Sequence, residues 1–399
     1  MNNRHLDWPF FDPVHRTFAR DFSQWAASEL PKYDDNDGGD GEAAREILRR
    51  LGISKWLENS IPRTKRAGRD EYDLRTICLM REILGYRSGI ADVAFSEPWL
   101  GFMPIALFGS ESMQNELLPG YLRGDMLPAF ALSEPGAGSD AAAIQTQAHL
   151  DGAHYVIKGR KTWTSNSGLA DVYVVFARTS EGPGADGISA FVVDGGISGI
   201  TLQERLSVLS PHTVGTLYLD DVRVDANCLL GEPGQGLKIA MAVLELFRPT
   251  VGAATLGFAR RAMDEATARS MERVAFGKPI CEHQLVQGKL ADMAVKVDAA
   301  ALLVYRAAWM HDVGESRITR EAAIAKLHAT EAAQEVVDQA LQIFGGLGVV
   351  KGIVVERLYR HVRAFRIFDG TSEIQRLIIA KDILSENKPG KGTSPRRMG

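Results

Sequence analysis

Five short segments of the chain combine residue types that can hold a ligand or move a proton. The first runs from Phe130 to Ser139 and joins an apolar stretch to a turn rich in Gly and Ser. Glycine lets backbone N–H groups approach a ligand closely, and a serine hydroxyl both donates and accepts hydrogen bonds. A tight surface turn that binds nothing is the alternative interpretation.

The second segment, residues 161–166, places Trp163 between hydroxyl side chains at the end of a predicted strand. The indole could pack against a planar ring, and a neighbouring hydroxyl could bond the polar edge of that ring. Taken alone, however, the segment favours a tryptophan in the protein core.

The third and fourth segments lie in the last third of the chain. One runs from Arg273 to Ile280 and is followed by Gln284. The other covers residues 342–348, where Gly345 and Gly346 interrupt a helical pattern. Such an interruption exposes backbone N–H groups, which suit phosphate oxygens.

The fifth segment places the carboxylate of Asp369 before a Gly-Thr turn that opens a predicted helix. The alternative without function is a helix cap, with Thr371 as the capping residue and Glu373 in the first turn.

Motifs of several other enzyme classes are absent from the sequence. It contains no His-Glu-x-x-His, no Gly-x-Ser-x-Gly and no Gly-x4-Gly-Lys-Ser/Thr. Residues 136–141 match the Gly-x-Gly-x-x-Gly/Ala dinucleotide fingerprint, but a Rossmann unit requires a helix and then a parallel strand. A short Ala run and hairpin-like strands follow instead, which argues against that unit.

The hydrophobic periodicity predicts helices, then strands, then helices. Residues 11–124 and 234–384 repeat apolar positions with the helical period, whereas residues 127–230 contain short β-branched and aromatic runs with turn residues between them. We therefore predict an α+β multidomain fold with divisions at 1–126, 127–232 and 233–386. Residues 387–399 read as a disordered tail.

The composition of the chain restricts the classes of partner that it could bind. The 399 residues include 46 Lys and Arg against 50 Asp and Glu, a net charge of −4, which argues against nucleic acid. No apolar run reaches the ~18 residues of a membrane span, and the N-terminus has no apolar signal core. The three cysteines, Cys78, Cys228 and Cys281, are too few and too scattered for a disulfide framework or a metal site. A cytoplasmic protein is expected.

Together and in this order, the five segments resemble the acyl-CoA dehydrogenase family over nearly the whole chain. The resemblance implies an N-terminal helical domain, a central antiparallel β-domain and a C-terminal four-helix bundle. It also implies FAD as cofactor, an acyl-CoA substrate and an electron-transfer flavoprotein or similar acceptor. The family's FAD contacts divide between two subunits, so a homo-oligomer is expected, a tetramer rather than a dimer.

Carried over position by position, the resemblance implies a set of site residues. The cofactor-binding residues are Phe130, Leu132, Ser133, Gly138, Ser139, Trp163, Ser165, Arg273, Phe276, Gln284, Gln342, Gly345, Gly346, Thr371 and Glu373. The substrate-binding residues are Ser139, Glu245, Arg248 and Gly370.

The resemblance makes Asp369 the catalytic base that removes the α-proton of the thioester. The family's usual residue here is Glu, and some members carry a Glu at the position of Phe247 instead. Asp is one methylene shorter, and a displacement of that size is serious for catalysis unless the substrate moves to meet it. A branched, cyclic or aromatic acyl group is therefore expected.

Three alternatives share this fold. Two are enzymes with a different substrate, and the third has no catalytic turnover. Asp at the base position also occurs in nitroalkane oxidases, which return electrons to oxygen. The loop at residues 205–210 departs from the family pattern, so an acyl carrier protein could replace CoA as the thioester carrier. A family member that binds flavin without catalysis is the third.

Overall fold

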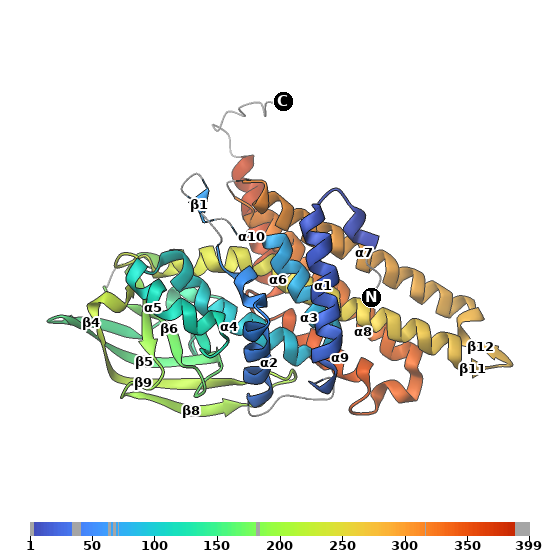
Figure 1. The fold of residues 1–399 in the computed structure, drawn as a ribbon, viewed down its shortest axis with the longest axis horizontal. Coiled ribbons are helices and arrows are strands. Elements are labelled where there is room, and N and C mark those ends of the chain that lie inside the picture. Colours follow the sequence, from blue (N-terminus) through green and yellow to red (C-terminus); the bar gives the residue numbers. More distant parts are fainter. Residues whose placement is uncertain are drawn as a thin grey trace.

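The computed structural model describes residues 4–33, 41–62, 65–66, 69–70, 72–180, 184–315 and 317–387. Helices, a sheet and further helices follow one another along the chain (Figure 1). This is the order predicted from the hydrophobic periodicity. Residues 388–399 of the predicted tail lie outside the described part.

The N-terminal region consists of helices, of which α3 and α4 are almost wholly buried. Both helices are buried around most of their circumference, including charged residues such as Arg81 in α3 and Asp92 in α4, so each must be covered on several sides. By contrast, α1 and α2 bury one face and expose the other. The helices are α1 (Pro13–Glu29), α2 (Glu42–Ile53), α3 (Leu74–Arg87), α4 (Gly89–Phe108) and α5 (Glu111–Leu122), and the short strands β1 (Lys65–Arg66) and β2 (Arg69–Asp70) pair with each other.

The central region is an eight-stranded sheet with the order β10-β7-β6-β4-β5-β9-β8, and β3 pairs with β6 off this path. The sheet is antiparallel as predicted, except that β3 runs parallel to β6 and β4 joins β6 in parallel at one residue pair. The strands are β3 (Pro128–Ala131), β4 (Gln147–Asp151), β5 (His154–Ser165), β6 (Val172–Arg178), β7 (Ile188–Asp194), β8 (Ile200–Leu206), β9 (Val214–Asp225) and β10 (Leu229–Leu230).

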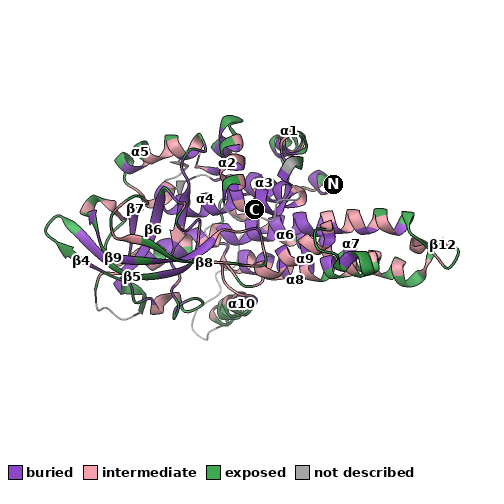
Figure 2. Ribbon diagram, turned by 90° about the horizontal axis from the view of Figure 1, so that it is seen from below, coloured by how far each residue is buried: buried purple, intermediate pink, exposed green. Residues whose placement is uncertain are grey.

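Long helices make up the C-terminal region. Helix α6 packs against α3, α7 and α8, and Figure 2 shows buried residues concentrated where α3, α4 and α6 meet. These helices are α6 (Gly236–Glu272), α7 (Gln284–Asp312), α8 (Thr319–Phe344), α9 (Val354–Phe365) and α10 (Ser372–Glu386), and the hairpin strands β11 (Val274–Ala275) and β12 (Lys278–Pro279) join α6 to α7.

Helix α6 continues unbroken through Pro249. It is also the one helix in the described part of the chain that is long and apolar enough, by length and composition, to cross a membrane. Within the fold, 78% of its most apolar stretch is buried against other elements. Its apolar character is thus accounted for by its central place between α3 and α8.

The boundaries near residues 126 and 232 remain a proposal. They are supported by the connections in which they fall, because α5 ends at Leu122 before β3 begins at Pro128, and β10 ends at Leu230 before α6 begins at Gly236.

Two glycines let α3 and α6 cross at very short range. A Cβ atom on Gly257 would lie 2.1 Å from the carbonyl oxygen of Glu82, and one on Gly85 would lie 2.6 Å from the carbonyl oxygen of Ala254. No backbone atom can give way easily at such distances. The crossing fixes the two helices that carry much of the site described below.

We therefore predict that Gly257→Ala destabilises the protein by ~1–3 kcal/mol, the usual cost of overpacking. The matched control is Gly288→Ala in α7, where nothing lies within 4 Å of an added Cβ. There, alanine should be neutral or stabilising by ~0.5–1 kcal/mol, because glycine is unfavourable inside a helix. Denaturant unfolding of both variants is the measurement, and equal effects would contradict this account of the crossing.

Candidate active site

Asp369 lies in the short connection between α9 and α10. Its backbone has φ of 57°, in the left-handed region that non-glycine residues rarely adopt, and Gly370 follows with φ of 88°. Holding a non-glycine residue there costs ~1–3 kcal/mol, and such strain persists only where the surroundings enforce it. A strained carboxylate of this kind is typical of functional sites.

The surroundings do enforce this conformation. The carbonyl of Gly370 accepts hydrogen bonds from Lys326 Nζ at 2.9 Å and from Gln375 Nε2 at 2.8 Å. Thr371 caps α10 by accepting the N–H of Ile374 at 3.3 Å. The capping interpretation of this segment therefore holds, and it does not compete with function, since the cap fixes the turn after the carboxylate.

The electrostatic environment of Asp369 suits a base that works near neutral pH. Burial raises its pKa to about 7, and the nearby charge of Glu97 acts in the same direction, while Lys326, Arg81 and His212 oppose them. A catalytic base is most effective when its pKa lies near the working pH.

A small pocket adjoins this carboxylate, and all three regions of the chain contribute to its wall. Arg81, Asp92 and Glu97 come from α3 and α4, His212 from the connection between β8 and β9, and Phe368 from the turn before Asp369. The aromatic rings of Phe258 and Phe365 also line it.

Arg81 and Asp92 form a buried ion pair in this wall. The Nε and Nη2 atoms of Arg81 each donate to Asp92 at 2.8 Å, and Nη1 donates to the hydroxyl of Thr250 at 3.1 Å. The guanidinium also lies over the ring of Phe247, 4.9 Å from its centroid. Because both charges are fully enclosed, their mutual bidentate bonding is what makes their burial tolerable.

Glu97, Ser165 and His212 form a hydrogen-bonded chain in the same place. The hydroxyl of Ser165 donates to Glu97 Oε2 at 2.6 Å, and His212 Nε2 lies 2.9 Å from the Ser165 oxygen. Burial lowers the pKa of His212 to about 4, so its imidazole is neutral at pH 7. Burial raises the pKa of Glu97, although Ser165 and Arg81 favour its charged form.

The position of the alternative base holds a buried ring. Phe247 is 1% exposed and packs against Trp99, with ring centroids 5.5 Å apart. Glu245, two residues earlier, accepts hydrogen bonds from the hydroxyl of Thr319 and the N–H of Ile318, at the start of α8. The charge that acts most strongly on Asp369 comes instead from Glu97.

Arg248 is buried in α6, and the charge of Asp369 acts on it. Burial lowers the pKa of its guanidinium, against the effects of Glu245 and Asp369. Of the predicted substrate-binding residues, Arg248 and Gly370 therefore lie with the base, whereas Glu245 is engaged at a helix start.

The Ser-Glu-Pro-Gly turn is built on a buried ion pair. Glu134 and Ala137 exchange backbone hydrogen bonds of 3.0 Å across the turn. Beneath it, Lys161 Nζ donates to Glu134 Oε1 at 2.7 Å and to the carbonyl of Leu132 at 3.0 Å. The turn leaves Gly138 and Ser139 exposed. The segment is thus a turn at the surface, and its rigid base would let it present backbone groups to a ligand.

Trp163 is not a core residue, contrary to what its segment alone favoured. It is 61% exposed, and its φ is 56°. The pairing of β5 with β9 shifts register between Lys161 and Thr164, and this irregularity turns the indole out of the regular alternation of the strand. Phe130 in β3 is half-buried and packs against Phe176.

Six of the predicted cofactor-binding residues lie far from Asp369 and the Ser-Glu-Pro-Gly turn. The hairpin β11–β12 and the end of α8 stand at the opposite end of the long axis from the sheet (Figure 1). Phe276 is 96% exposed with φ of 53°. The other exposed members of this group are Arg273, Gln284, Gln342, Gly345 and Gly346. One chain alone therefore does not bring the two groups together.

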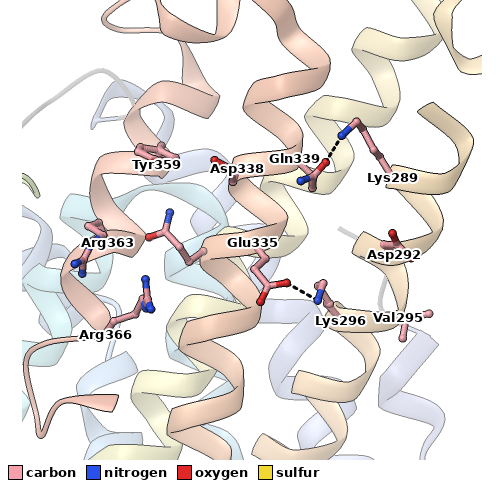
Figure 3. Close-up of a pocket in the computed structure, with 11 residues that line it drawn as sticks. Lys289, Asp292, Val295, Lys296, Glu335, Asp338, Gln339, Tyr359, Arg363 and Arg366 are labelled. Atoms are coloured by element: carbon pink, nitrogen blue, oxygen red, sulfur yellow. Dashed lines mark hydrogen bonds and ion pairs between the residues drawn. The ribbon is translucent and has the colours of Figure 1, made fainter. Parts of the chain in front are cut away.

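Another hollow lies between α7, α8 and α9 (Figure 3), and none of the predicted site residues lines it. Its walls are charged and partly paired. Lys296 bonds Glu335 at 2.5 Å, and Lys289 donates to Gln339 at 2.5 Å.

By distance alone, one group of three described side chains could hold a metal ion. The ligand atoms of His15, Asp73 and Asp312 lie within 4.8 Å of one another. However, Asp73 accepts the N–H of Thr76 at 3.1 Å, and Asp312 accepts the N–H of Leu74 at 2.8 Å. We assign these carboxylates to capping the start of α3.

Sequence reasoning missed Glu97, His212, Arg81, Asp92 and Lys326. One signal was present: each of the four charged residues among them sits in a helical segment at a position that the apolar pattern buries. A buried charge needs a partner, so these positions could have been flagged as a network. His212 carried no such signal, because it lies in an irregular connection.

The helix–sheet–helix order of the chain differs from the alternating strands and helices of a Rossmann enzyme. Family comparison identifies the class. Three acyl-CoA dehydrogenase profiles match in order, for the N-terminal domain over residues 12–125, the middle domain over 129–222 and the C-terminal domain over 234–384. The chain belongs to the acyl-CoA dehydrogenase family.

Two similar relatives have names that mention ring compounds. The chain is 37% identical over 383 residues to a 3-(aryl)acrylate reductase of Clostridium sporogenes, covering 94% of this chain and 100% of the relative. It is 42% identical over 290 residues to a cyclohexane-1-carbonyl-CoA dehydrogenase of Geobacter metallireducens, covering 72% and 76%.

A solved structure of an acyl-CoA dehydrogenase complexed with FAD, from Bacillus anthracis, superposes with a TM-score of 0.85. The two sequences are 31% identical, and the match covers 94% of this chain and 68% of the other. The predicted fold and family are thus confirmed.

The buried lysine under the turn generates a prediction. Lys161→Met should leave Glu134 as an unpaired buried carboxylate, at a cost of ~3–5 kcal/mol. Lys158→Met, on the same strand, removes only solvent-exposed pairings with Asp220 and Asp221 and should cost ~0–1 kcal/mol. Thermal unfolding of both variants is the measurement. Equal midpoints would show that the Lys161 pair does not support the turn.

Proposed function

We propose that this chain catalyses the FAD-dependent α,β-dehydrogenation of an acyl-CoA thioester, with Asp369 removing the α-proton. The observation that carries the proposal is the carboxylate itself. It is fixed in a strained backbone, adjoins a pocket, and has a pKa raised to about 7. Membership of the acyl-CoA dehydrogenase family supports the same reaction.

The described residues fit FAD. Trp163 and Phe276 expose flat rings that a globular chain would otherwise bury, and both are held in the left-handed region. Gly136, Gly138, Gly345 and Gly346 have open space where a side chain would stand. The solved relative complexed with FAD supports the assignment.

On this proposal, Phe130, Leu132, Ser133, Gly138, Ser139, Trp163 and Ser165 hold the flavin half, with Thr371 and Glu373. Arg273, Phe276, Gln284, Gln342, Gly345 and Gly346 hold the adenine half bound mainly to a neighbouring subunit. Bound FAD would supply the acceptor for the β-hydride.

The chain's own residues handle the proton. Ionised Asp369 takes the α-proton, and the positive charges of Lys326 and Arg81 stabilise that ionised form before the reaction. Lys326 also donates a hydrogen bond to the carbonyl of Gly370, which fixes the backbone next to Asp369. Ser139, Glu245, Arg248 and Gly370 are proposed to contact the acyl thioester.

We propose a ring-bearing acyl group as the substrate. Phe258, Phe365 and Phe368 contribute aromatic walls. The names of two relatives, an aryl-acrylate reductase and a cyclohexane-carbonyl-CoA dehydrogenase, point the same way. The carrier is proposed to be CoA, and electron-transfer flavoprotein is proposed as acceptor.

We predict that Asp369→Asn keeps the shape of the site but loses the base. Flavin reduction by an acyl-CoA under anaerobic conditions should slow by about a hundredfold to ten-thousandfold. Asp298→Asn, on the exposed side of α7, is the control and should reduce at the parental rate. Near-parental reduction by Asp369→Asn would overturn the assignment.

The rate of flavin reduction should also depend on pH in a defined direction. Because the pKa of Asp369 is raised to about 7, the carboxyl is protonated below that pH and cannot accept the α-proton. Stopped-flow reduction rates in the parent protein should therefore rise as the pH increases through about 7. A rate that falls over this range would contradict Asp369 as the base.

We further predict that Arg273→Ala weakens FAD retention, because a pyrophosphate would lose a charge-assisted hydrogen bond worth ~1.5–3 kcal/mol. Flavin absorbance after gel filtration measures this, with Arg20→Ala on the exposed face of α1 as the control. Equal retention in the two variants would show that Arg273 does not hold the cofactor.

Because the two groups of cofactor residues stand at opposite ends of one chain, the active species should be an oligomer, and we propose a tetramer. Sedimentation velocity of the FAD-loaded protein tests this. An active monomer at assay concentration would contradict the division of the site between subunits.

A further inference from the structure

The turn that carries Asp369 is joined at both of its ends to one residue of α8. The turn runs from Arg366 to Ser372, and the N–H of Ser372 donates to the carbonyl of Arg366 at 3.0 Å. At this junction, Glu331 Oε1 accepts the Ser372 hydroxyl at 2.5 Å, and Glu331 Oε2 pairs with Arg366 Nη2 at 2.7 Å. The two oxygens of one carboxylate thus bridge the ends of the turn, and Asp369 lies midway between those ends.

The charge and burial of the three bridged residues suit this role. Burial would raise the pKa of Glu331, but the hydrogen bonds from Ser372 and Arg366 lower it overall, so the carboxylate is ionised at neutral pH. Ser372 is 2% exposed, and a hydroxyl that donates to a charged acceptor makes a short, strong bond. The side chain of Arg366 is 34% exposed, and an exposed ion pair alone contributes little. We therefore expect the bond from Ser372 to be the stronger half of the bridge.

The turn needs this bridge because its middle is strained. Asp369 has φ of 57° and Gly370 has φ of 88°. Lys326 and Gln375 hold the carbonyl of Gly370, on the C-terminal side of the base. The bridge holds the turn at its two ends instead. Without it, the turn could widen and the carboxylate could move while the rest of the protein stayed folded, and a displacement of about 1 Å can cost about a hundredfold in rate.

We propose that Glu331 is a positioning residue for the base. By joining Arg366 to Ser372, it sets where the Asp369 carboxylate stands against the α-carbon of the thioester. This inference rests on the proposed acyl-CoA dehydrogenation. Glu331 acts through the turn and not by contact with the substrate, so its loss should slow removal of the α-proton without weakening binding of the thioester.

The first test breaks both halves of the bridge with Glu331→Ala. The control is Glu335→Ala, which also removes a paired carboxylate from α8, but one whose partner is Lys296 of α7 at 2.5 Å (Figure 3). Anaerobic flavin reduction by cyclohexane-1-carbonyl-CoA is followed over a range of concentrations. Glu331→Ala should lower the limiting rate by about tenfold to a hundredfold with the KM nearly unchanged. The control should keep both parental values.

A second variant assigns the effect to the bridge. Ser372→Ala removes the buried half alone, so it should also slow flavin reduction in the parent protein. In the Glu331→Ala background the same change should have little further effect, because residues that act through one interaction are not additive. Additive slowing would show that Glu331 and Ser372 act separately.

The mobility of the turn provides a readout that does not need turnover. Amide hydrogen exchange of the segment 366–375 should be about tenfold faster or more in Glu331→Ala than in the parent, because the turn opens locally more often. Glu335→Ala should exchange in this segment at the parental rate. If Glu331→Ala does not fold, Ser372→Ala is measured in the same two assays.

The outcomes separate this inference from the proposed function. If no thioester reduces the flavin of the parent, the proposed function fails, and faster exchange in Glu331→Ala would still show that the bridge holds the turn. If the parent is active but Glu331→Ala keeps the parental limiting rate or the parental exchange, the positioning role is overturned. Slower reduction that arises only from a raised KM would overturn it as well.

Discussion

The hydrogen bond from Lys326 to the carbonyl of Gly370 is the interaction on which the site depends. Lys326 is fully buried in α8, and burial lowers the pKa of its ammonium to about 8, against the attraction of Asp369. The same side chain therefore does two things. It fixes the backbone that carries the base, and it places a positive charge that favours the ionised form of that base.

This arrangement requires helices that cannot shift. Gly85 and Gly257 bring α3 and α6 into backbone contact, and buried ion pairs join the elements around them. Arg81 of α3 bonds Asp92 of α4, and Arg260 of α6 pairs with Glu82 of α3 at 2.7 Å. Each buried charge is costly alone, so the pairs permit essentially one relative placement of the helices. Because residues of these helices line the pocket, its wall is held in place as well.

The order of helical and strand regions could be predicted from the sequence, because hydrophobic periodicity depends only on residues near one another in the chain. It also marked Asp369, because a carboxylate before a Gly-Thr turn at a helix start is a local pattern. The exposure of Trp163 could not be predicted in the same way, since it results from a register shift between β5 and β9. Nor could Glu97 be joined to Asp369, because α4 and the α9–α10 connection meet only through tertiary packing.

The ring at Phe247 can be understood from the charges around it. Arg81 donates hydrogen bonds to Asp92 and lies over the ring of Phe247. The negative charges of Glu97 and Asp369 also act on it. A carboxylate at this position would add another anion beside a cation that is already committed, and its burial would raise its pKa. With an aromatic ring there, the guanidinium gains a cation–π contact without further negative charge. The base is thereby left to the α9–α10 turn, where Lys326 supplies a separate positive charge.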